Sequence, residues 1–157
     1  TTGKLNLNHL KIPPALIGAG FALIQLVVAR QIPRLAVEIE TQIPIALFVA
    51  AIGFGIAIFG VLSFKKAATT VNPLSPEKTR SLVKSGVYSY SRNPMYLGMM
   101  IVLVAWSIYI GNVASTAIVV LFWAYITHFQ IKPEEEALNV LFPEDFRDYC
   151  QNIRRWL

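Results

Sequence analysis

The clearest apolar run of the sequence is IPIALFVAAIGFGIAIFGVLSF, which extends for 22 residues from Ile43 to Phe64 without a charged side chain. About 20 such residues are enough for a helix to cross the hydrocarbon core of a bilayer. Gly53, Gly55 and Gly60 recur at close helical spacing in this run, and small residues let a second helix approach the backbone. The run therefore predicts a transmembrane helix that packs closely against a neighbour.

Three further uncharged runs have similar lengths: 18 residues in Ile12–Ala29, 16 in Met95–Ile110 and 19 in Val113–Ile131. We expect the third helix to begin slightly earlier, at Pro94, because proline suits the first position of a helix. Only Gly111-Asn112 separates the last two runs, which predicts a tight antiparallel hairpin.

The first run has an alternative interpretation as a cleavable signal peptide, because Val27-Val28-Ala29 resembles a cleavage site. Signal cores usually have about 7–15 apolar residues, and here the run is longer and more spans follow. We therefore interpret it as a membrane anchor.

The composition excludes several classes of protein. Of 157 residues, 55% are hydrophobic and 15% are charged, whereas a soluble domain carries about 25% charged residues. The net charge of +5 does not indicate nucleic acid, because the basic residues lie between apolar runs, where they would face lipid and cytoplasm. One cysteine, Cys150, and two histidines, His9 and His128, are too few for a metal site or a disulfide scaffold.

The fold class predicted is all-α: one integral membrane domain, residues 1–157, with four spans at 12–29, 43–64, 94–110 and 113–131. The loop 65–94 carries six basic residues and a single acidic one, so the positive-inside rule places it in the cytoplasm. Four spans then put both termini and the tail 132–157 on the same side. The loop and the tail can therefore meet at one membrane face.

The tail has a regular pattern of apolar residues at spacings of three and four: Phe142, Phe146, Tyr149, Ile153 and Trp156. This periodicity predicts an amphipathic C-terminal helix. Such a helix can lie on the bilayer surface, which the periodicity alone favours, or form a lid over a site.

Two segments combine residues that could bind a zwitterion. Asn93 is placed to cap the third helix, whose first N–H groups and positive dipole attract a carboxylate. Nearby tyrosines at 88, 90 and 96 offer faces to an adenine or a cation, although an aromatic belt at the membrane surface would look the same. The acidic run Glu134–Glu136 begins the tail directly after the fourth span.

These segments resemble a known family. Arg80–Tyr88 reads RSLVKSGVY, Arg92–Gly98 reads RNPMYLG, and Glu134-Glu135 is followed by the apolar positions of the tail. This order and spacing is similar to the isoprenylcysteine carboxyl methyltransferases, and phospholipid methyltransferases share the pattern. The resemblance covers roughly the second half of the chain.

The resemblance implies an enzyme that uses S-adenosylmethionine, held where the basic loop, the start of the helix hairpin and the tail converge. It implies cofactor contacts at Arg80, Ser81, Leu82, Val83, Tyr88, Asn93, Pro94, Met95, Tyr96 and Glu134. The family often has histidine where this chain has Arg80 and Asn93. It also has a substrate-binding arginine where this chain has Gln130, a neutral amide that holds an anion more weakly.

The expected activity is methyl transfer to a lipophilic acceptor that enters from the bilayer, with an isoprenylcysteine carboxylate as the first choice. Such a carboxylate is already ionised at pH 7 and needs no general base. A phospholipid amine is the alternative acceptor; an amine must lose a proton, for which His128 is a candidate unless it only packs against a neighbouring helix. Gln130 and His128 are the substrate-contact candidates, with no catalytic residue assigned. A non-enzymatic membrane scaffold is the competing interpretation.

Overall fold

The structure is a computed structural model whose described residues are 12–33, 39–67 and 81–157. Every regular element in these ranges is a helix, which confirms the all-α prediction. The helices are α1 (Pro14–Ala29), α2 (Ile39–Lys66), the short 3-10 helix η3 (Gly86–Ser89), α3 (Pro94–Ile110), α4 (Val113–Ile126), the π-helical η4 (Thr127–Ile131), α5 (Lys132–Leu141) and α6 (Pro143–Asn152).

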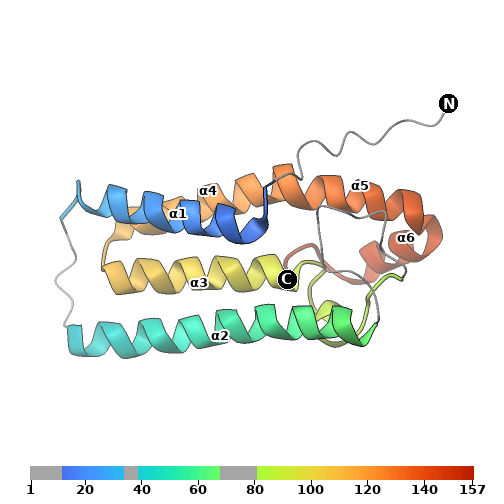
Figure 1. Cartoon of the computed structure of the whole chain (residues 1–157), viewed down its shortest axis with the longest axis horizontal. Coiled ribbons are helices and arrows are strands. Elements are labelled where there is room, and N and C mark those ends of the chain that lie inside the picture. Colours follow the sequence, from blue (N-terminus) through green and yellow to red (C-terminus); the bar gives the residue numbers. More distant parts are fainter. Residues whose placement is uncertain (1–11, 34–38, 68–80) are drawn as a thin grey trace.

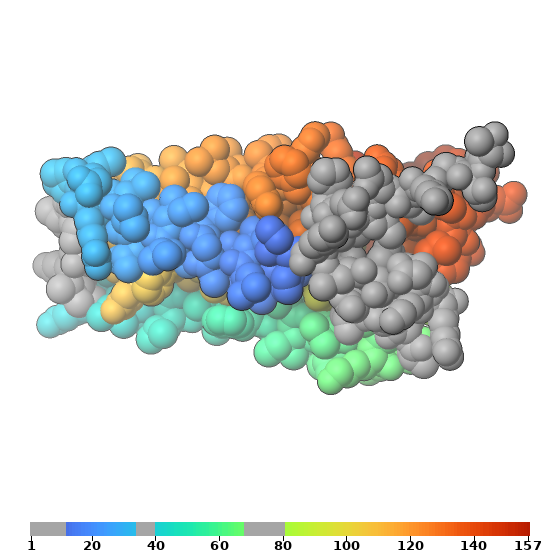
Figure 2. Space-filling view, turned by 45° about the horizontal axis from the view of Figure 1, so that its top comes forward, coloured from blue at the N-terminus to red at the C-terminus, as the bar shows by residue number. Residues whose placement is uncertain are grey.

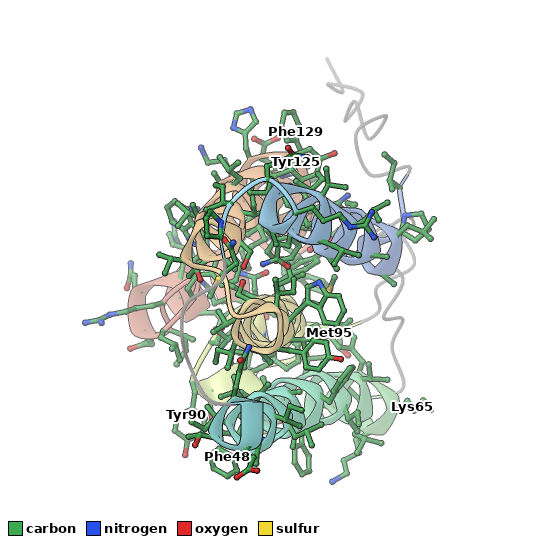
Figure 3. All side chains as sticks on the ribbon, turned by 90° about the vertical axis from the view of Figure 1, so that its left-hand side faces the viewer. Phe48, Lys65, Tyr90, Met95, Tyr125 and Phe129 are labelled. Atoms are coloured by element: carbon green, nitrogen blue, oxygen red, sulfur yellow. The ribbon has the colours of Figure 1, made fainter. Side chains whose placement is uncertain are left out.

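The centre of the bundle is α3. Figure 1 shows α2 along one side of α3 and α1 with α4 along the other, and the end-on view of Figure 3 shows the same order. The core on the α1–α4 side includes Ile17, Leu103, Phe122 and Ile126, with Phe21 packed edge-on against Phe122. Because other helices pack on both sides of α3, its position is fixed. The segments attached to its two ends are positioned with it.

The contact between α2 and α3 depends on glycine. A Cβ on Gly98 would lie 2.5 Å from the carbonyl oxygen of Gly53 and 2.9 Å from the backbone nitrogen of Ala57, and a Cβ on Gly53 would lie 2.7 Å from the carbonyl oxygen of Gly98. The two backbones therefore touch directly. This confirms the close helix contact that the glycine spacing of the second run predicts.

Polar side chains connect the helices at the hairpin end of the bundle. Gln25 is fully buried, and its amide nitrogen lies 2.7 Å from Ser107 Oγ and 3.0 Å from the Ser115 carbonyl. The hairpin itself turns at Gly111, which has a positive φ of 70°, and Asn112 caps α4 by accepting hydrogen bonds from two backbone amides. The Gly-Asn hairpin is thus confirmed.

Two of the helices are long and apolar enough to cross a membrane: Glu40–Lys66, and the continuous helix Val113–Leu141, whose uncharged part ends at Ile131. The outward side of α2 exposes Phe48 and Phe59 (Figure 3 labels Phe48), a surface that suits lipid. The first and third runs form α1 and α3, which are apolar but shorter, at 16 and 17 residues.

Two boundaries differ from those predicted. The second helix extends over 39–66 instead of 43–64, so Pro44 lies one turn further inside it than predicted. The tail is not one helix: α5 continues directly from α4 through the π-helical η4, and the chain breaks at Phe142-Pro143 before α6 begins. Proline cannot donate the backbone hydrogen bond that a continuous helix would need there.

Gly98→Ala and Gly55→Ala should change stability in opposite directions. The new methyl group at position 98 collides with the backbone of α2, so we expect a loss of about 1–3 kcal/mol. A Cβ at Gly55 meets nothing within 4 Å, so alanine should add up to about 1 kcal/mol through helix propensity. Thermal unfolding of the two variants in detergent measures this. Equal melting temperatures would contradict the backbone contact.

Candidate functional site

The start of α3 presents backbone N–H groups that are not used by the helix. The first helical hydrogen bond runs from Leu97 N to the Asn93 carbonyl, at 2.9 Å, and Pro94 has no N–H. The amides of Met95 and Tyr96 therefore precede the hydrogen-bonded part of α3, where the helix dipole is positive. This end of α3 can receive a negatively charged group.

A partly buried hydrogen bond joins this helix start to the start of α5. The Tyr96 hydroxyl donates to Glu134 Oε1 at 2.5 Å, across 38 residues of chain. Tyr96 is buried in the core cluster that also contains Ile17 and Ile131. The sequence predictions placed both Tyr96 and Glu134 at the site, and the structure brings them into direct contact.

Burial changes the protonation of this pair. It raises the pKa of Glu134 from 4.5 to about 8; the hydrogen bond from Tyr96 opposes the rise, and the neighbouring charge of Glu135 adds to it. Burial also raises the pKa of Tyr88, to which Tyr149 and Glu134 contribute. Glu134 is therefore largely protonated at neutral pH in this structure, and a cation bound beside it would favour its ionised form.

The tail packs over the loop and the start of α3. Tyr149 donates from its hydroxyl to the Tyr88 carbonyl at 2.6 Å, and Lys84 pairs with Asp145 at 2.9 Å. Phe146 and Tyr149 are both buried. The apolar side of α6 thus contacts protein, which is the arrangement that the lid hypothesis predicts.

Ion pairs connect the end of the tail to its first helix, α5. Glu135 pairs with Arg155 at 2.7 Å and with Arg92 at 3.2 Å. Arg92 also contacts the sulfur of Cys150, and its backbone N–H donates to the Arg154 carbonyl at 3.0 Å. The end of the tail is therefore held against the start of α3 by both charge and backbone hydrogen bonds.

The predicted cofactor contacts have two kinds of surroundings: one faces α5, and others pack against α2. Tyr96 faces Glu134, whereas Tyr88 packs edge-on against Phe64 of α2 and Met95 lies where a Cβ on Gly60 would collide with it. Val83 and Pro94 are buried, Leu82 is half-buried, and Ser81 Oγ lies 3.5 Å from the Ala67 carbonyl. Arg80 lies outside the described residues.

Asn93 occupies the capping position of α3, but its side chain makes no capping hydrogen bond. Its amide nitrogen instead donates to the Arg155 carbonyl at 3.0 Å. The expected cap is wrong because the tail, 62 residues later in the chain, offers this amide an acceptor.

The two substrate-contact candidates have different surroundings. Gln130 is 1% exposed; its amide nitrogen donates to the Ile12 carbonyl at 3.3 Å, and its Oε1 is buried without a hydrogen-bond partner. His128 is exposed, and its ring packs edge-on against Phe129. Both lie in η4, and π-helical turns occur frequently at functional sites.

Sequence reasoning did not find Arg155 and Tyr149 as site residues, or Gln25 as a helix connector. The pair Arg154-Arg155 after an amphipathic helix is a weak signal of a partner for the acidic run at 134–136.

Within the described ranges, no group of three or more His, Cys, Asp or Glu residues could hold a metal ion.

Comparisons with known proteins identify a family. Residues 41–145 match the phospholipid methyltransferase family, and this range extends from the start of α2 into α6. A relative from Haemophilus influenzae, described as an uncharacterized protein, is 40% identical over 63 residues, which are 40% of this chain and 100% of the relative. No solved structure matches the chain.

Glu134→Gln should remove a pH dependence of stability. The folded pKa of about 8 exceeds the ordinary 4.5, so the folded state binds this proton more tightly. The stability of the wild type should be complete below about pH 4.5 and decline as the pH rises to about 8. The neutral amide should abolish that decline. Melting temperatures between pH 5 and pH 9 test this, with Glu136→Gln, an exposed position on the same helix, as the control. Parallel curves for all three proteins would contradict the assignment.

Proposed function

Because the chain belongs to the phospholipid methyltransferase family, integral membrane methyltransferases that include the isoprenylcysteine carboxyl methyltransferases, we propose that it transfers a methyl group from S-adenosylmethionine to a lipophilic acceptor. The site is the convergence of the loop 81–93, the start of α3, and the tail. The observation that carries this proposal is the partly buried hydrogen bond between Tyr96 and Glu134, which joins two of these segments.

The residues at this convergence fit the cofactor. S-adenosylmethionine, when bound, supplies a methyl group on a positively charged sulfur, together with an amino group and a carboxylate. The free amides of Met95 and Tyr96 suit the carboxylate, and Glu134 suits a positive charge. The remaining proposed contacts are Arg80, Ser81, Leu82, Val83, Tyr88, Asn93 and Pro94.

The contribution of the protein to methyl transfer is alignment and exclusion of water. Methyl transfer from a sulfonium is an in-line displacement, for which positioning supplies much of the acceleration. Tyr149 bonds to the loop at the Tyr88 carbonyl, and the ion pairs of Glu135 hold the end of the tail in place. The tail therefore excludes solvent from one side of the site.

The acceptor has two candidate classes. A prenylated cysteine would present a carboxylate, which needs a hydrogen-bond donor or a cation. Gln130 uses one N–H of its amide nitrogen on the Ile12 carbonyl, and its Oε1, which can only accept, is buried without a partner. This observation favours the second class, a phospholipid amine, whose N–H groups can donate to Oε1. The exposed His128 is the candidate to receive the proton that an amine loses.

The topology follows from the same arrangement. We place all four long apolar runs across the membrane, with the loop, the tail and both termini on the cytoplasmic side. The lengths of α2 and of Val113–Leu141 support two of these spans, and the basic loop supports the orientation. A lipophilic acceptor then arrives from the bilayer, and the water-soluble cofactor arrives from the cytoplasm.

Calorimetry with S-adenosylhomocysteine tests the cofactor site. Wild-type protein in detergent should bind it with micromolar affinity, and Glu134→Ala should weaken binding about tenfold or more through loss of a charged contact. Glu136→Ala, exposed on the same helix, should bind like the wild type. An absence of heat for the wild type at every concentration would favour the non-enzymatic scaffold.

Labelled S-adenosylmethionine tests the acceptor. The protein is incubated with a phosphatidylethanolamine or with a prenylated cysteine analogue that carries a free carboxylate. We expect label on the amine, with activity reduced about tenfold in Gln130→Leu, which keeps the size of the side chain and removes Oε1. Label on the carboxylate alone would reverse the choice of acceptor and leave the methyltransferase assignment intact.

A further inference from the structure

A long furrow extends along α3 between α1 and α2, on the side away from α4. Both α1 and α2 pack against α3. Figure 2 shows the part of α3 nearest the hairpin between α1 and α2. The apolar portion of the furrow has a cavity volume of about 660 Å³, and a second portion of about 360 Å³ continues it at the hairpin end, since both are lined by Ile43, Trp106 and Tyr109.

The walls of the apolar portion consist mainly of small residues. Ala19 and Ala22 of α1 face Ala46 and Ala50 of α2 across the floor formed by α3. Small residues on two helices normally permit close packing, yet here the helices stand apart. An unfilled space of this size loses the dispersion contacts of its lining atoms. The shape suits a linear hydrocarbon chain.

The polarity of the furrow changes along its length. Its polar residues lie at the end where α1 stops and α2 starts, and they include Arg30 and Gln42. Trp106 and Tyr109 stack with ring centroids 5.3 Å apart at this same end, as aromatic residues do at a membrane interface. Figure 1 shows that α5 and α6, which carry the candidate site, lie at the opposite end of the bundle.

The arrangement matches one kind of amphiphile. Arginine binds phosphate through several N–H groups, and Arg30 ends α1 where the furrow reaches the membrane surface. We propose that the furrow binds one phospholipid from the leaflet opposite the candidate site, with one acyl chain along α3 and the phosphate at Arg30. This lipid fills the space between α1 and α2, and its binding does not depend on the methyltransferase proposal.

The chain of the methyl acceptor is the main competing occupant. Its reacting head would lie near Glu134, and nothing in that arrangement requires a cation at the far end. The positions of Arg30 and the two stacked aromatic rings, at the end away from Glu134, therefore favour the opposite-leaflet phospholipid.

Native mass spectrometry of the protein released from a mild detergent tests the lipid site. With added phosphatidylglycerol, the wild type should retain one phospholipid per chain. Arg30→Ala should reduce its occupancy about tenfold, the effect of losing one charge-assisted hydrogen-bond partner. Arg147→Ala, an exposed arginine on α6, is the matched control and should not change it. Equal retention in Arg30→Ala and the wild type would overturn the head-group assignment.

The furrow itself is tested by filling it. Ala19→Phe should abolish retention, whereas Gly55→Phe, which enters open space on α2 outside the furrow, should not. Loss in Ala19→Phe without loss in Arg30→Ala would identify an acyl chain whose head lies elsewhere, and would refute the proposed orientation. If the wild type forms lipid-free dimers and Ala19→Phe dissociates them, a second copy of the chain is the occupant. That result would also refute the phospholipid proposal.

Photo-crosslinking keeps the test valid if Ala19→Phe does not fold. A phosphatidylglycerol with a diazirine in its acyl chain should label wild-type peptides that contain Ala46, Ala50 or Ala19. Labels confined to the outer side of α2, near Phe48 and Phe59, would indicate bulk lipid only and overturn the proposal. Binding of S-adenosylhomocysteine should be the same with and without the lipid, so a failure of either proposal leaves the other testable.

Discussion

The position of the site depends on a carboxyl group that is buried where apolar helices end. Glu134 is the third residue after the fourth apolar run, and burial there is costly unless a partner is present. Tyr96 is that partner, and the hydrogen bond fixes the start of α5 against the start of α3. With this contact made, the tail beyond α5 returns toward the loop, where Tyr149 reaches the Tyr88 carbonyl.

Much of the fold could be predicted from the sequence because it follows from local patterns. Uncharged runs of 16 to 22 residues become helices in an apolar bundle, and Gly111-Asn112 becomes the hairpin because glycine accepts the positive φ there. Pro94 begins α3 as expected. The close contact at Gly53 and Gly98 also follows from sequence, since two glycines remove the side chains that would keep the helices apart.

The remainder depends on partners that are distant along the chain. Asn93 is a good cap by every local rule, yet its amide donates to the Arg155 carbonyl, a group that only the folded tail delivers. The apolar spacing of the tail correctly selects Phe146 and Tyr149 as buried residues but does not reveal the break before Pro143. Gln25 has no sequence signature either, because its partners belong to α3 and α4.

The two ends of the bundle are held by different chemistry, and this difference has a consequence for pH. At the hairpin end, the amides of Gln25, Gln42 and Asn112 bind hydroxyls and backbone carbonyls, none of which titrates near neutral pH. At the other end, Glu134 has a pKa of about 8, and Glu135 is paired with two arginines. A change of pH therefore acts on the contacts around the candidate site while the hairpin end stays fixed. The titrating contact of Glu134 with Tyr96 therefore lies at one end of α3, and the contacts that do not titrate near neutral pH lie at the other.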